Sequence, residues 1–344
     1  MSEPMDFEDR ARATLPPHIS AYYAAAAGSG VGLGEGTVDW SAIRFRPHVL
    51  HDVGSVSVAT TVLGTAVRTP VLVAPMAHQL GAHPDGEVAM GRAVASTGSL
   101  LGVSTNTGVP FAAIARTGAP WWFQVYVTRD HGLTEKLVER AVANGARALL
   151  FTVDMFARLP TNVDPLDWPE SAAKLRLANL TAEEQTAAGR EGLAADPSIN
   201  IATISWLRKL SGLPIVVKGV LRADDAQRCV DGGAAGIVVS THGGRRLGPT
   251  TSAARALPEI VLAIGDQAEI YADSGIRSGE HVAAAIAMGA RAVFVGRPVL
   301  WALAAAGQEA VEQVITSLTD ELANVMVQLG APTIDQLTAD LIVP

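Results

Sequence analysis

Short runs of consecutive apolar residues recur along the chain and alternate with polar turns and alanine-rich stretches. The runs are hydrophobic throughout, which is typical of parallel strands buried on both faces. Eight such runs are present, at 70–73, 100–103, 121–125, 148–153, 214–217, 236–239, 269–272 and 292–295. Helical stretches lie between them, at 86–96, 133–144, 223–232, 253–264 and 279–288. Eight parallel strands with crossover helices predict an α/β fold, a (β/α)8 TIM barrel.

The part of the chain before the first run, residues 1–69, is expected to form an N-terminal helical extension. The pattern predicts a helix near 10–27 and a small hairpin around 53–67. Between them, the glycine-rich sequence at 28–36 (GSGVGLGEG) indicates a flexible turn. These elements precede the barrel and do not belong to its repeat.

Two further segments lie outside the strand–helix repeat. The polar, alanine-rich stretch after the fourth run is too long for a simple connection, so we predict a lid insertion at 156–200. Apolar residues at helical spacing over 308–328 predict an amphipathic helix in a C-terminal segment, 308–344. We therefore expect a single domain, 1–344, with its barrel at 70–307.

Composition excludes some classes of protein without changing this fold. The chain has 344 residues, 49% of them hydrophobic and 17% charged, which is ordinary for a globular protein. Length alone allows two domains or one barrel with additions, and the eight runs favour the barrel. The formal net charge is -8 and no run of Lys and Arg stands out, which argues against nucleic-acid binding.

Cysteine use and apolar segments indicate a cytoplasmic protein. A single cysteine, Cys229, excludes an intramolecular disulfide framework, and no signal-peptide pattern opens the chain. The longest uncharged stretch, 93–115, contains several hydroxyl side chains, an asparagine and a proline, so we expect no membrane span. His78 and His83 lack metal-ligand spacing, and no metal is expected.

Polar and charged residues are concentrated where the eight runs end. Active sites of TIM barrels form at the C-terminal ends of the strands, so these residues are expected to share one rim. In chain order, the residues at or shortly after the run ends, including a few apolar ones and glycines, are Pro75, Met76, Ala77, Ser104, Gln124, Tyr126, Thr152, Asp154, Lys218, Ser240, His242, Arg245, Asp273, Gly275, Arg277, Gly296 and Arg297. A purely structural barrel would not need this set.

The loops after the last two strands suggest a phosphate site. They run DSGIRSG (273–279) and GRP (296–298), and their glycines allow the backbone to approach a ligand closely. Arg277 and Arg297 would pair with phosphate oxygens, although both could instead be surface charges at helix starts. We favour a phosphorylated ligand or cofactor.

The sixth strand ends in a sequence suited to proton transfer. His242 and Arg245 follow it, separated by two glycines. Histidine transfers protons near neutral pH and arginine binds carboxylates, so together they suit a carboxylate substrate that must lose a proton. Asp154 on the same rim could orient the imidazole, and Lys218 at the end of a buried strand should face an anionic or electron-rich partner.

The motifs together resemble one enzyme family, the FMN-dependent 2-hydroxy acid oxidases and dehydrogenases, which includes glycolate oxidase, lactate oxidase and mandelate dehydrogenase. The resemblance covers nearly the whole chain. It rests on LP followed by YY, FRPHVLHDV, PVLVAPMA with HPDGE, WFQVYV, FTVD, LPIVVKGV, STHGGR, ADSGIRSG and AVFVGRP. It implies FMN as cofactor, oxidation of a 2-hydroxy acid to a 2-oxo acid, and a homo-oligomer, commonly a tetramer.

The resemblance also implies roles for the residues that match its motifs. His242 would remove a proton from the substrate while electrons pass to flavin N5, by a hydride or a carbanion route. Tyr22 and Arg245 would bind the substrate carboxylate, and Tyr126 would hydrogen-bond the reacting oxygen. Asp154 would stabilise the imidazolium.

The cofactor would be held by the remaining residues of the rim. Lys218 would lie beside flavin N1 and the C2 carbonyl, where its charge favours the anionic reduced flavin. Met76 is expected to line both the substrate and the cofactor. The isoalloxazine, ribityl chain and phosphate would contact Pro75, Met76, Ala77, Ser104, Gln124, Thr152, Ser240, Asp273, Gly275, Arg277, Gly296 and Arg297.

Several positions depart from the family pattern. The motif S-N-H-G-x-R-x-L-D has Thr241 in place of asparagine and Gly248 in place of aspartate. Ser274 replaces the first of two glycines after the seventh strand, and Met76 stands where a small residue or threonine is common. These changes all fall on the expected rim.

A second carboxylate-binding arginine is also missing from its usual place. The family continues after T-V-D into L-G-R-R, whereas this chain continues MFARLPTN and has Thr161 at the second arginine's position. Arg158 could substitute only if the loop shifts. We therefore expect a larger, aromatic or unusual 2-hydroxy acid as substrate.

Other functions remain open at this point. The missing arginine allows an amine, an amino acid or another non-standard substrate from a biosynthetic pathway, and the barrel allows an FMN-dependent isomerase or an FMN-binding protein. A nicotinamide enzyme is disfavoured because Gly28, Gly30, Gly32 and Gly34 neither follow a strand nor match G-x-G-x-x-G. The electron acceptor could be oxygen, a quinone or a carrier protein.

Overall fold

Eight parallel strands close into a barrel within the residues that the computed structural model describes, 7–155 and 177–343. Neighbouring strands are hydrogen-bonded in the order β10-β3-β4-β5-β6-β7-β8-β9. Their bounds are Val71–Met76 (β3), Leu101–Val103 (β4), Trp121–Val125 (β5), Leu149–Thr152 (β6), Ile215–Val220 (β7), Gly236–Val239 (β8), Glu269–Ala272 (β9) and Ala292–Val295 (β10). The predicted TIM barrel is therefore confirmed.

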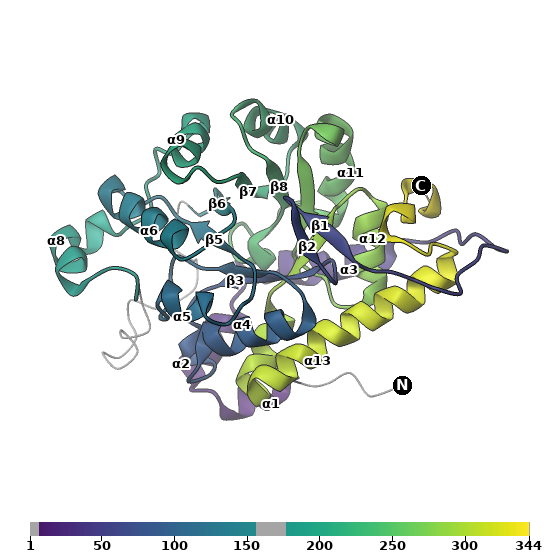
Figure 1. Ribbon diagram of the computed structural model, residues 1–344, viewed down its shortest axis with the longest axis horizontal. Helices are drawn as coiled ribbons and strands as arrows, with labels where there is room; N and C mark the ends of the chain where they lie inside the picture. Colours follow the sequence, from purple (N-terminus) through teal and green to yellow (C-terminus); the bar gives the residue numbers. More distant parts are fainter. Residues whose placement is uncertain (1–6, 156–176, 344) are drawn as a thin grey trace.

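Helices cover the outside of the barrel (Figure 1). The five helices expected between strands are present, and their ends agree with the prediction to within two residues. The helices that follow the barrel strands along the chain are α4 (Gly86–Thr97), α5 (Phe111–Ala115), α6 (His131–Ala143), α8 (Ala182–Gly192), α9 (Ile201–Ser211), α10 (Ala223–Asp231), α11 (Ala253–Ile264), α12 (Gly279–Ala287) and α13 (Arg297–Leu329).

Both faces of each barrel strand are buried, which explains the continuous apolar runs. On β3, Val71 and Val73 belong to the core beneath the helices, whereas Leu72 belongs to the core inside the barrel. The interior is filled by side chains that include Trp122, which lies 5.5 Å from Tyr271 between ring centroids. Because the interior is packed, a ligand must bind above it, at one end of the strands.

A hairpin closes the N-terminal end of the barrel. It consists of β1 (Thr60–Val62) and β2 (Thr65–Val67), an antiparallel pair, as the sequence predicted. Val62 and Val67 join the interior core, and the backbone N–H of Leu63 donates to the Glu269 carboxylate at 3.0 Å. The opposite end, where the strands finish, is therefore the end left for the site.

The N-terminal extension contains more helices than expected. The single helix predicted near 10–27 is instead two helices, α1 (Phe7–Thr14) and α2 (Pro17–Ala24). Pro16 and Pro17 separate them because proline cannot donate a backbone hydrogen bond within a helix. α1 packs against α13 and α2.

The glycine-rich stretch is also a correction. It was expected to be a flexible turn, but α3 (Val31–Ala42) is helical and includes most of it. The glycines there permit close packing, since a Cβ added at Gly32 would lie 2.6 Å from the Gly248 carbonyl oxygen. Likewise, a Cβ added at Gly275 would lie 2.2 Å from the Gly36 carbonyl oxygen. Tertiary contact with the site loops therefore overrides the low helix propensity of glycine.

Part of the predicted lid is a helix held against α6. α8 begins at a capping box, in which Thr181 and Glu184 bond each other's backbone N–H. Glu184 also pairs with Arg140 of α6 at 2.8 Å and with Lys136 at 3.3 Å. The rest of the predicted lid, 156–176, which contains Arg158 and Thr161, lies outside the described residues.

α13 contains the predicted C-terminal helix. Its backbone departs from helical geometry at Ala306 and Gly307, which separate the last barrel helix from the segment predicted at 308–328. Figure 1 shows the long helix running alongside α4, α12 and α1, against which it packs. Among the described helices, neither α13 nor any other is long and apolar enough to cross a membrane.

Candidate active site

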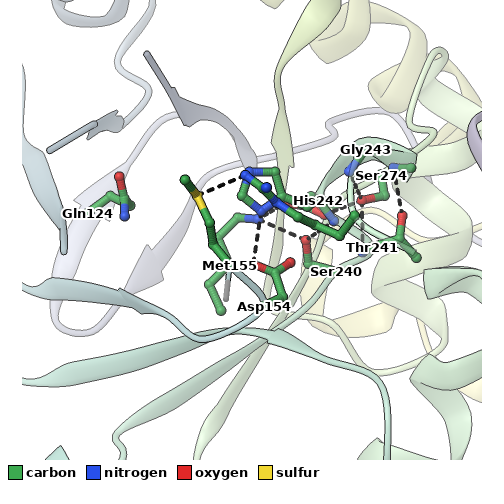
Figure 2. A network of polar contacts seen from close by, with 12 residues as sticks. Gln124, Asp154, Met155, Ser240, Thr241, His242, Gly243 and Ser274 are labelled. Atoms are coloured by element: carbon green, nitrogen blue, oxygen red, sulfur yellow. Dashed lines mark hydrogen bonds and ion pairs between the residues drawn. The ribbon is translucent and has the colours of Figure 1, made fainter. Parts of the chain in front are cut away.

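The predicted site residues meet at the C-terminal ends of the barrel strands. Figure 2 shows part of this rim, with His242 between Asp154 on one side and the loop of Ser274 on the other. Asp154 follows β6, His242 follows β8, and Ser274 follows β9. The barrel topology therefore places side chains that are far apart in sequence around one space.

His242 is paired with Asp154. The imidazole Nδ1 lies 2.9 Å from Asp154 Oδ1, and both side chains are largely buried. Burial lowers the pKa of His242 and outweighs the opposing effect of Asp154. Burial acts to raise the pKa of Asp154, but the charges of His242, Lys218 and Arg246 outweigh it and lower that pKa. The free site therefore holds a neutral imidazole beside a carboxylate.

This pairing determines which nitrogen of His242 can act as a base. An ionised carboxylate only accepts hydrogen bonds, so the proton of the neutral imidazole lies on Nδ1. The lone pair is then on Nε2, the nitrogen that does not face Asp154. The arrangement can take a proton at Nε2 and stabilise the resulting imidazolium through Asp154.

Lys218 lies in β7 and is buried among polar partners. Its Nζ donates to Ser240 Oγ at 2.8 Å and is 2.9 Å from Asp273 Oδ2. Only 6% of the Lys218 side chain and 8% of the Asp273 side chain are exposed, so neither charge is solvated by bulk water. The pair keeps a cation at the rim without leaving it uncompensated.

Arg245 and Tyr22 come together although they are far apart in sequence. The Arg245 guanidinium lies 4.8 Å above the Tyr22 ring, and Nη1 donates to the Tyr22 carbonyl oxygen at 2.8 Å. Burial lowers the pKa of Arg245. Burial also raises the pKa of Tyr126, so its hydroxyl stays protonated and can donate a hydrogen bond. The three side chains can together bind a carboxylate and an adjacent oxygen.

Arg245 also forms a cluster with Arg277 and Arg297. Burial lowers the pKa of Arg297, and the charges of Arg245 and Arg277 lower it further. In the described part of the chain, the hydrogen bonds of these guanidinium groups all go to backbone carbonyl oxygens, such as those of Gly243 and Ala25. Within the described residues none of the three guanidinium groups is paired with a carboxylate, which fits Arg277 and Arg297 for a phosphate and Arg245 for a carboxylate ligand.

Buried polar atoms fit the rest of the cofactor. Gln124 Oε1 accepts hydrogen bonds from Ser104 Oγ and from the Thr105 backbone, both at 3.2 Å. Gln124 Nε2 and Thr152 Oγ1 are buried and have no hydrogen-bond partner within the described chain. Unpaired buried donors are costly, so these atoms point to a ligand with hydrogen-bonding groups, as a flavin has. The residues present therefore fit FMN.

The remaining predicted residues lie at the same rim. Pro75 and Met76 end β3 and Ala77 follows it. Gly296 precedes α13, and a Cβ added there would lie 3.7 Å from Met76 Sδ, an ordinary contact. Gly275, at φ +103, instead has a clear packing role against α3. The arginine missing from the sequence motif falls at Thr161, outside the described residues, as does Arg158.

Sequence reasoning missed Arg246. Its Nη2 lies 2.8 Å from Sδ of Met155, the residue after Asp154. Its charge acts to lower the pKa values of Tyr126, Asp154 and His242, which places the guanidinium beside the site. The only sequence signal was its position directly after Arg245, which does not show where the side chain points.

Comparisons with known proteins agree with this geometry. The family model for FMN-dependent dehydrogenases matches residues 11–344. L-lactate oxidase of Nostoc sp. is 39% identical over 347 residues, covering 96% of this chain and 95% of that protein. Glycolate oxidase 1 of Zea mays is 37% identical, with coverages of 97% and 93%.

A solved structure is similar over the whole chain. Mandelate oxidase with benzoyl-formic acid superimposes with a TM-score of 0.89 at 34% identity, covering 100% of this chain and 98% of the other. Both the sequence and the fold therefore match along their full length. The chain belongs to the FMN-dependent dehydrogenase family, the 2-hydroxy acid oxidase family that its motifs indicated, and it is an oxidoreductase with FMN as its cofactor.

Proposed function

We propose that the protein oxidises a 2-hydroxy acid to the 2-oxo acid with His242 as the base. The observation that carries this proposal is the buried pair of His242 and Asp154, 2.9 Å apart, at the rim that also holds Arg245 and Tyr22. It provides a proton acceptor beside a carboxylate-binding group. In a 2-hydroxy acid the carboxylate and the carbon that bears the reacting C–H and O–H groups are directly bonded, so one small molecule can contact both.

The proton step follows from the state of the pair. Nε2 of the neutral His242 accepts one proton as two electrons leave the substrate carbon. In a hydride route the base takes the hydroxyl proton, and the C–H hydrogen leaves with both electrons. In a carbanion route the base takes the C–H proton, and the hydroxyl proton is released as the two electrons pass to the acceptor. Both routes need a base in this position. Asp154 then stabilises the imidazolium, whose charge would otherwise be costly in a buried site.

Substrate orientation would come from three side chains. Arg245 and Tyr22 bind the carboxylate, and the Tyr126 hydroxyl donates to the oxygen on the reacting carbon. Burial raises the pKa of Tyr126 and lowers that of His242, so near neutral pH the tyrosine is a donor while the imidazole is neutral. Fixing the carboxylate and the oxygen together directs the reacting C–H group.

FMN, when bound, supplies the two-electron acceptor. Lys218 would hold positive charge near the ring, which favours the reduced anionic cofactor. Gln124, Thr152, Ser104 and Ser240 would bond the ring and the ribityl chain. The end of β3 (Pro75, Met76 and Ala77) would contact the ring, and Asp273, Gly275, Arg277, Gly296 and Arg297 would hold ribityl and phosphate.

The substrate we favour is a larger, aromatic or unusual 2-hydroxy acid. The family's second carboxylate-binding arginine is replaced by Thr161 in the sequence register. Arg246 brings a different cation to the rim, next to Met155. The apolar side chains of Met76 and Met155 at this rim support a substrate with more apolar bulk than glycolate or lactate.

The test is anaerobic reduction of the bound flavin by a panel of acids. We expect mandelate or phenyllactate to bleach the flavin faster than glycolate or lactate, and His242→Ala to slow bleaching by about 10²- to 10⁴-fold while the protein keeps its yellow cofactor. Unchanged bleaching by His242→Ala would remove the proposed mechanism. Fastest bleaching by glycolate or lactate would remove only the substrate preference.

The same samples test the remaining predictions. Reoxidation in air, compared with a quinone or a carrier protein, identifies the electron acceptor. Release of ammonia would indicate an amine or amino-acid substrate, because the imine formed by its oxidation hydrolyses to ammonia and a carbonyl compound. Light scattering tests the predicted tetramer.

A further inference from the structure

Two serine hydroxyls hold the backbone on both sides of the His242 side chain. Ser274 Oγ accepts the backbone N–H of Thr241 at 3.1 Å and that of Gly243 at 3.0 Å. Ser240 Oγ accepts the N–H of His242 itself at 3.0 Å. Three consecutive N–H groups are therefore bonded to side chains from two different loops, which Figure 2 shows around His242.

The same two serines contact the buried Lys218–Asp273 pair. Lys218 Nζ donates to Ser240 Oγ at 2.8 Å, and Ser274 Oγ donates to Asp273 Oδ1 at 2.6 Å. Since Lys218 and Asp273 are 2.9 Å apart, the contacts form a closed ring through the backbone around His242. Ser274 is the member that joins the loop after β9 to the loop after β8.

Ser274 occupies this place at a conformational cost. Its φ is +66°, in the left-handed region that favours glycine, and His242 has φ +55° in the same junction. The family usually has glycine at the position of Ser274 and asparagine at the position of Thr241. Here the Thr241 hydroxyl stays local and accepts the Gly244 N–H at 3.3 Å. Both departures from the family motif therefore meet at one junction.

We propose that the Ser274 hydroxyl is a positioning element for the base, locking the His242 loop to the Lys218–Asp273 pair. This inference rests on the proposed role of His242. A non-glycine residue with positive φ is retained where surrounding contacts compensate for its strain, and here three hydrogen bonds supply that compensation. Ser274 does not touch the substrate and acts through the backbone on either side of His242.

The proposal predicts how the site responds when the hydroxyl is lost. The N–H groups of Thr241 and Gly243 lose their acceptor, so the loop that carries His242 becomes less ordered. Nε2 is then correctly placed for a smaller fraction of the time, which lowers the rate of proton removal. Arg245 keeps its contacts with Tyr22, so substrate binding is affected less than the chemical step.

The experiment compares Ser274→Ala with Ser274→Gly in the FMN-loaded protein. Both remove the hydroxyl, but only glycine also removes the strain at positive φ. We expect both variants to reduce flavin about tenfold more slowly with substrate affinity within about twofold of the original, an effect of the size of one or two lost hydrogen bonds. Water reaching the loosened loop should raise the pKa of His242, moving the acid limb of the rate profile to higher pH.

A direct readout does not depend on catalysis. Amide hydrogen exchange at Thr241 and Gly243 should become faster in both variants, because the acceptor of those two N–H groups is gone. Ser211→Ala is the matched control, since the Ser211 hydroxyl is also buried, donates to the Leu207 carbonyl at 2.8 Å and accepts the Leu213 N–H at 3.1 Å. It precedes β7 at the opposite end of the barrel and should alter neither rate nor exchange at the site.

The outcomes separate this inference from the proposed function. A normal rate and pH profile in Ser274→Gly would overturn the inference, because the hydroxyl would then be dispensable and any defect in Ser274→Ala would come from strain. Unchanged amide exchange in both variants would overturn it as well. If His242→Ala still reduces flavin normally, the proposed function fails, whereas a failure confined to the Ser274 variants leaves that function standing.

Discussion

The rim holds two groups of charged side chains that differ in how they are balanced. In the first, which we call the paired group, His242 faces Asp154 and Lys218 faces Asp273, each at 2.9 Å. In the second, the arginine group, Arg245, Arg277 and Arg297 are bonded to backbone carbonyl oxygens. The paired group carries its own counter-charges, and among the described residues the arginine group forms no ion pair with a carboxylate.

This difference indicates separate tasks. Asp154 fixes which nitrogen of His242 carries the proton before any ligand arrives, as a proton-transfer site requires, and Asp273 balances the charge of Lys218. Arginine keeps its proton near neutral pH, so a cluster of arginines without a paired carboxylate favours binding of an anion. The first group is therefore suited to chemistry and the second to holding the permanent anions, the cofactor phosphate and the substrate carboxylate.

Removing a counter-charge from the paired group should have the largest effect. Asp154→Asn leaves His242 without the charge that stabilises its protonated form, so we expect flavin reduction to slow by roughly 10²- to 10⁴-fold. Burial lowers the pKa of His242 and Asp154 opposes that shift, so the variant's acid limb should move to lower pH. Stopped-flow reduction across pH measures both effects.

The control for this variant is a histidine–aspartate pair elsewhere. His131 Nε2 lies 2.8 Å from Asp196 Oδ2, and the His131 side chain is exposed. Asp196→Asn removes the same kind of contact outside the site and should leave the rate unchanged. Equal slowing by both variants would mean that loss of the carboxylate acts through stability rather than through the base.

The next prediction compares a substitution in each group: the one in the paired group should lower stability, and the one in the arginine group should weaken FMN binding. Lys218→Met leaves Asp273 buried without its cation, which should destabilise even the flavin-free protein by about 3–5 kcal/mol. Arg297→Gln should instead weaken FMN binding by about 10- to 100-fold, the effect of a lost charge-assisted hydrogen bond, with a smaller effect on the flavin-free protein. Urea unfolding and FMN titration measure the two quantities.

An exposed arginine provides the reference. Arg222 pairs with Asp224 on the surface, and Arg222→Gln should change neither FMN affinity nor stability appreciably. If Arg297→Gln binds FMN as tightly as Arg222→Gln does, the arginine group has been assigned the wrong ligand.

The barrel could be predicted from the sequence because a strand buried on both faces consists of consecutive apolar residues. The runs at 121–125, 236–239, 269–272 and 292–295 match β5, β8, β9 and β10 in full. The same logic failed for α3, where glycine normally disfavours a helix. There the controlling contact is with Gly248 and Gly275, more than two hundred residues away, and no local pattern reports it.

Site residues near the ends of strands could be predicted from the sequence. Residues whose place in the site depends on the direction of the side chain were harder to predict. His242, Asp154 and Lys218 were found because each lies within three residues of the end of an apolar run. Tyr22 entered only through the family resemblance, since nothing in its helix indicates contact with Arg245. Arg246 was missed because a side chain's direction after a turn depends on packing that the sequence does not display.

A third kind of buried charge sharpens the comparison. Glu87 is fully buried, and burial raises its pKa to about 7 from an ordinary 4.5. Unlike an arginine, an unpaired carboxyl can become neutral by taking a proton. As pH rises from about 4.5 to 7, the unfolded chain releases this proton while the folded protein retains it, so stability falls, by about 3 kcal/mol in all.

Glu87→Gln removes this titration while keeping the shape of the side chain. The variant should therefore gain stability relative to the original protein as pH rises from 5 to 8, and urea unfolding at those two pH values measures the gain. Glu309→Gln, at an exposed position, is the control and should show no such trend. A stability difference that does not change with pH would show that Glu87 is ionised in the folded protein.

The smallest expected effect tests whether Arg246 belongs with the arginine group. Arg246→Gln should raise the KM for a 2-hydroxy carboxylate by about three- to tenfold, while an uncharged carboxamide analogue should show little change. The exposed Arg190→Gln should affect neither substrate. The direction of the pH shift is a second measurement. Burial and the Arg246 charge both lower the pKa of His242, so Arg246→Gln should move the acid limb of the rate profile to higher pH. Asp154→Asn should move it to lower pH. Shifts in the same direction for the two variants would mean that they act through a common loosening of the loop instead of through their opposite charges.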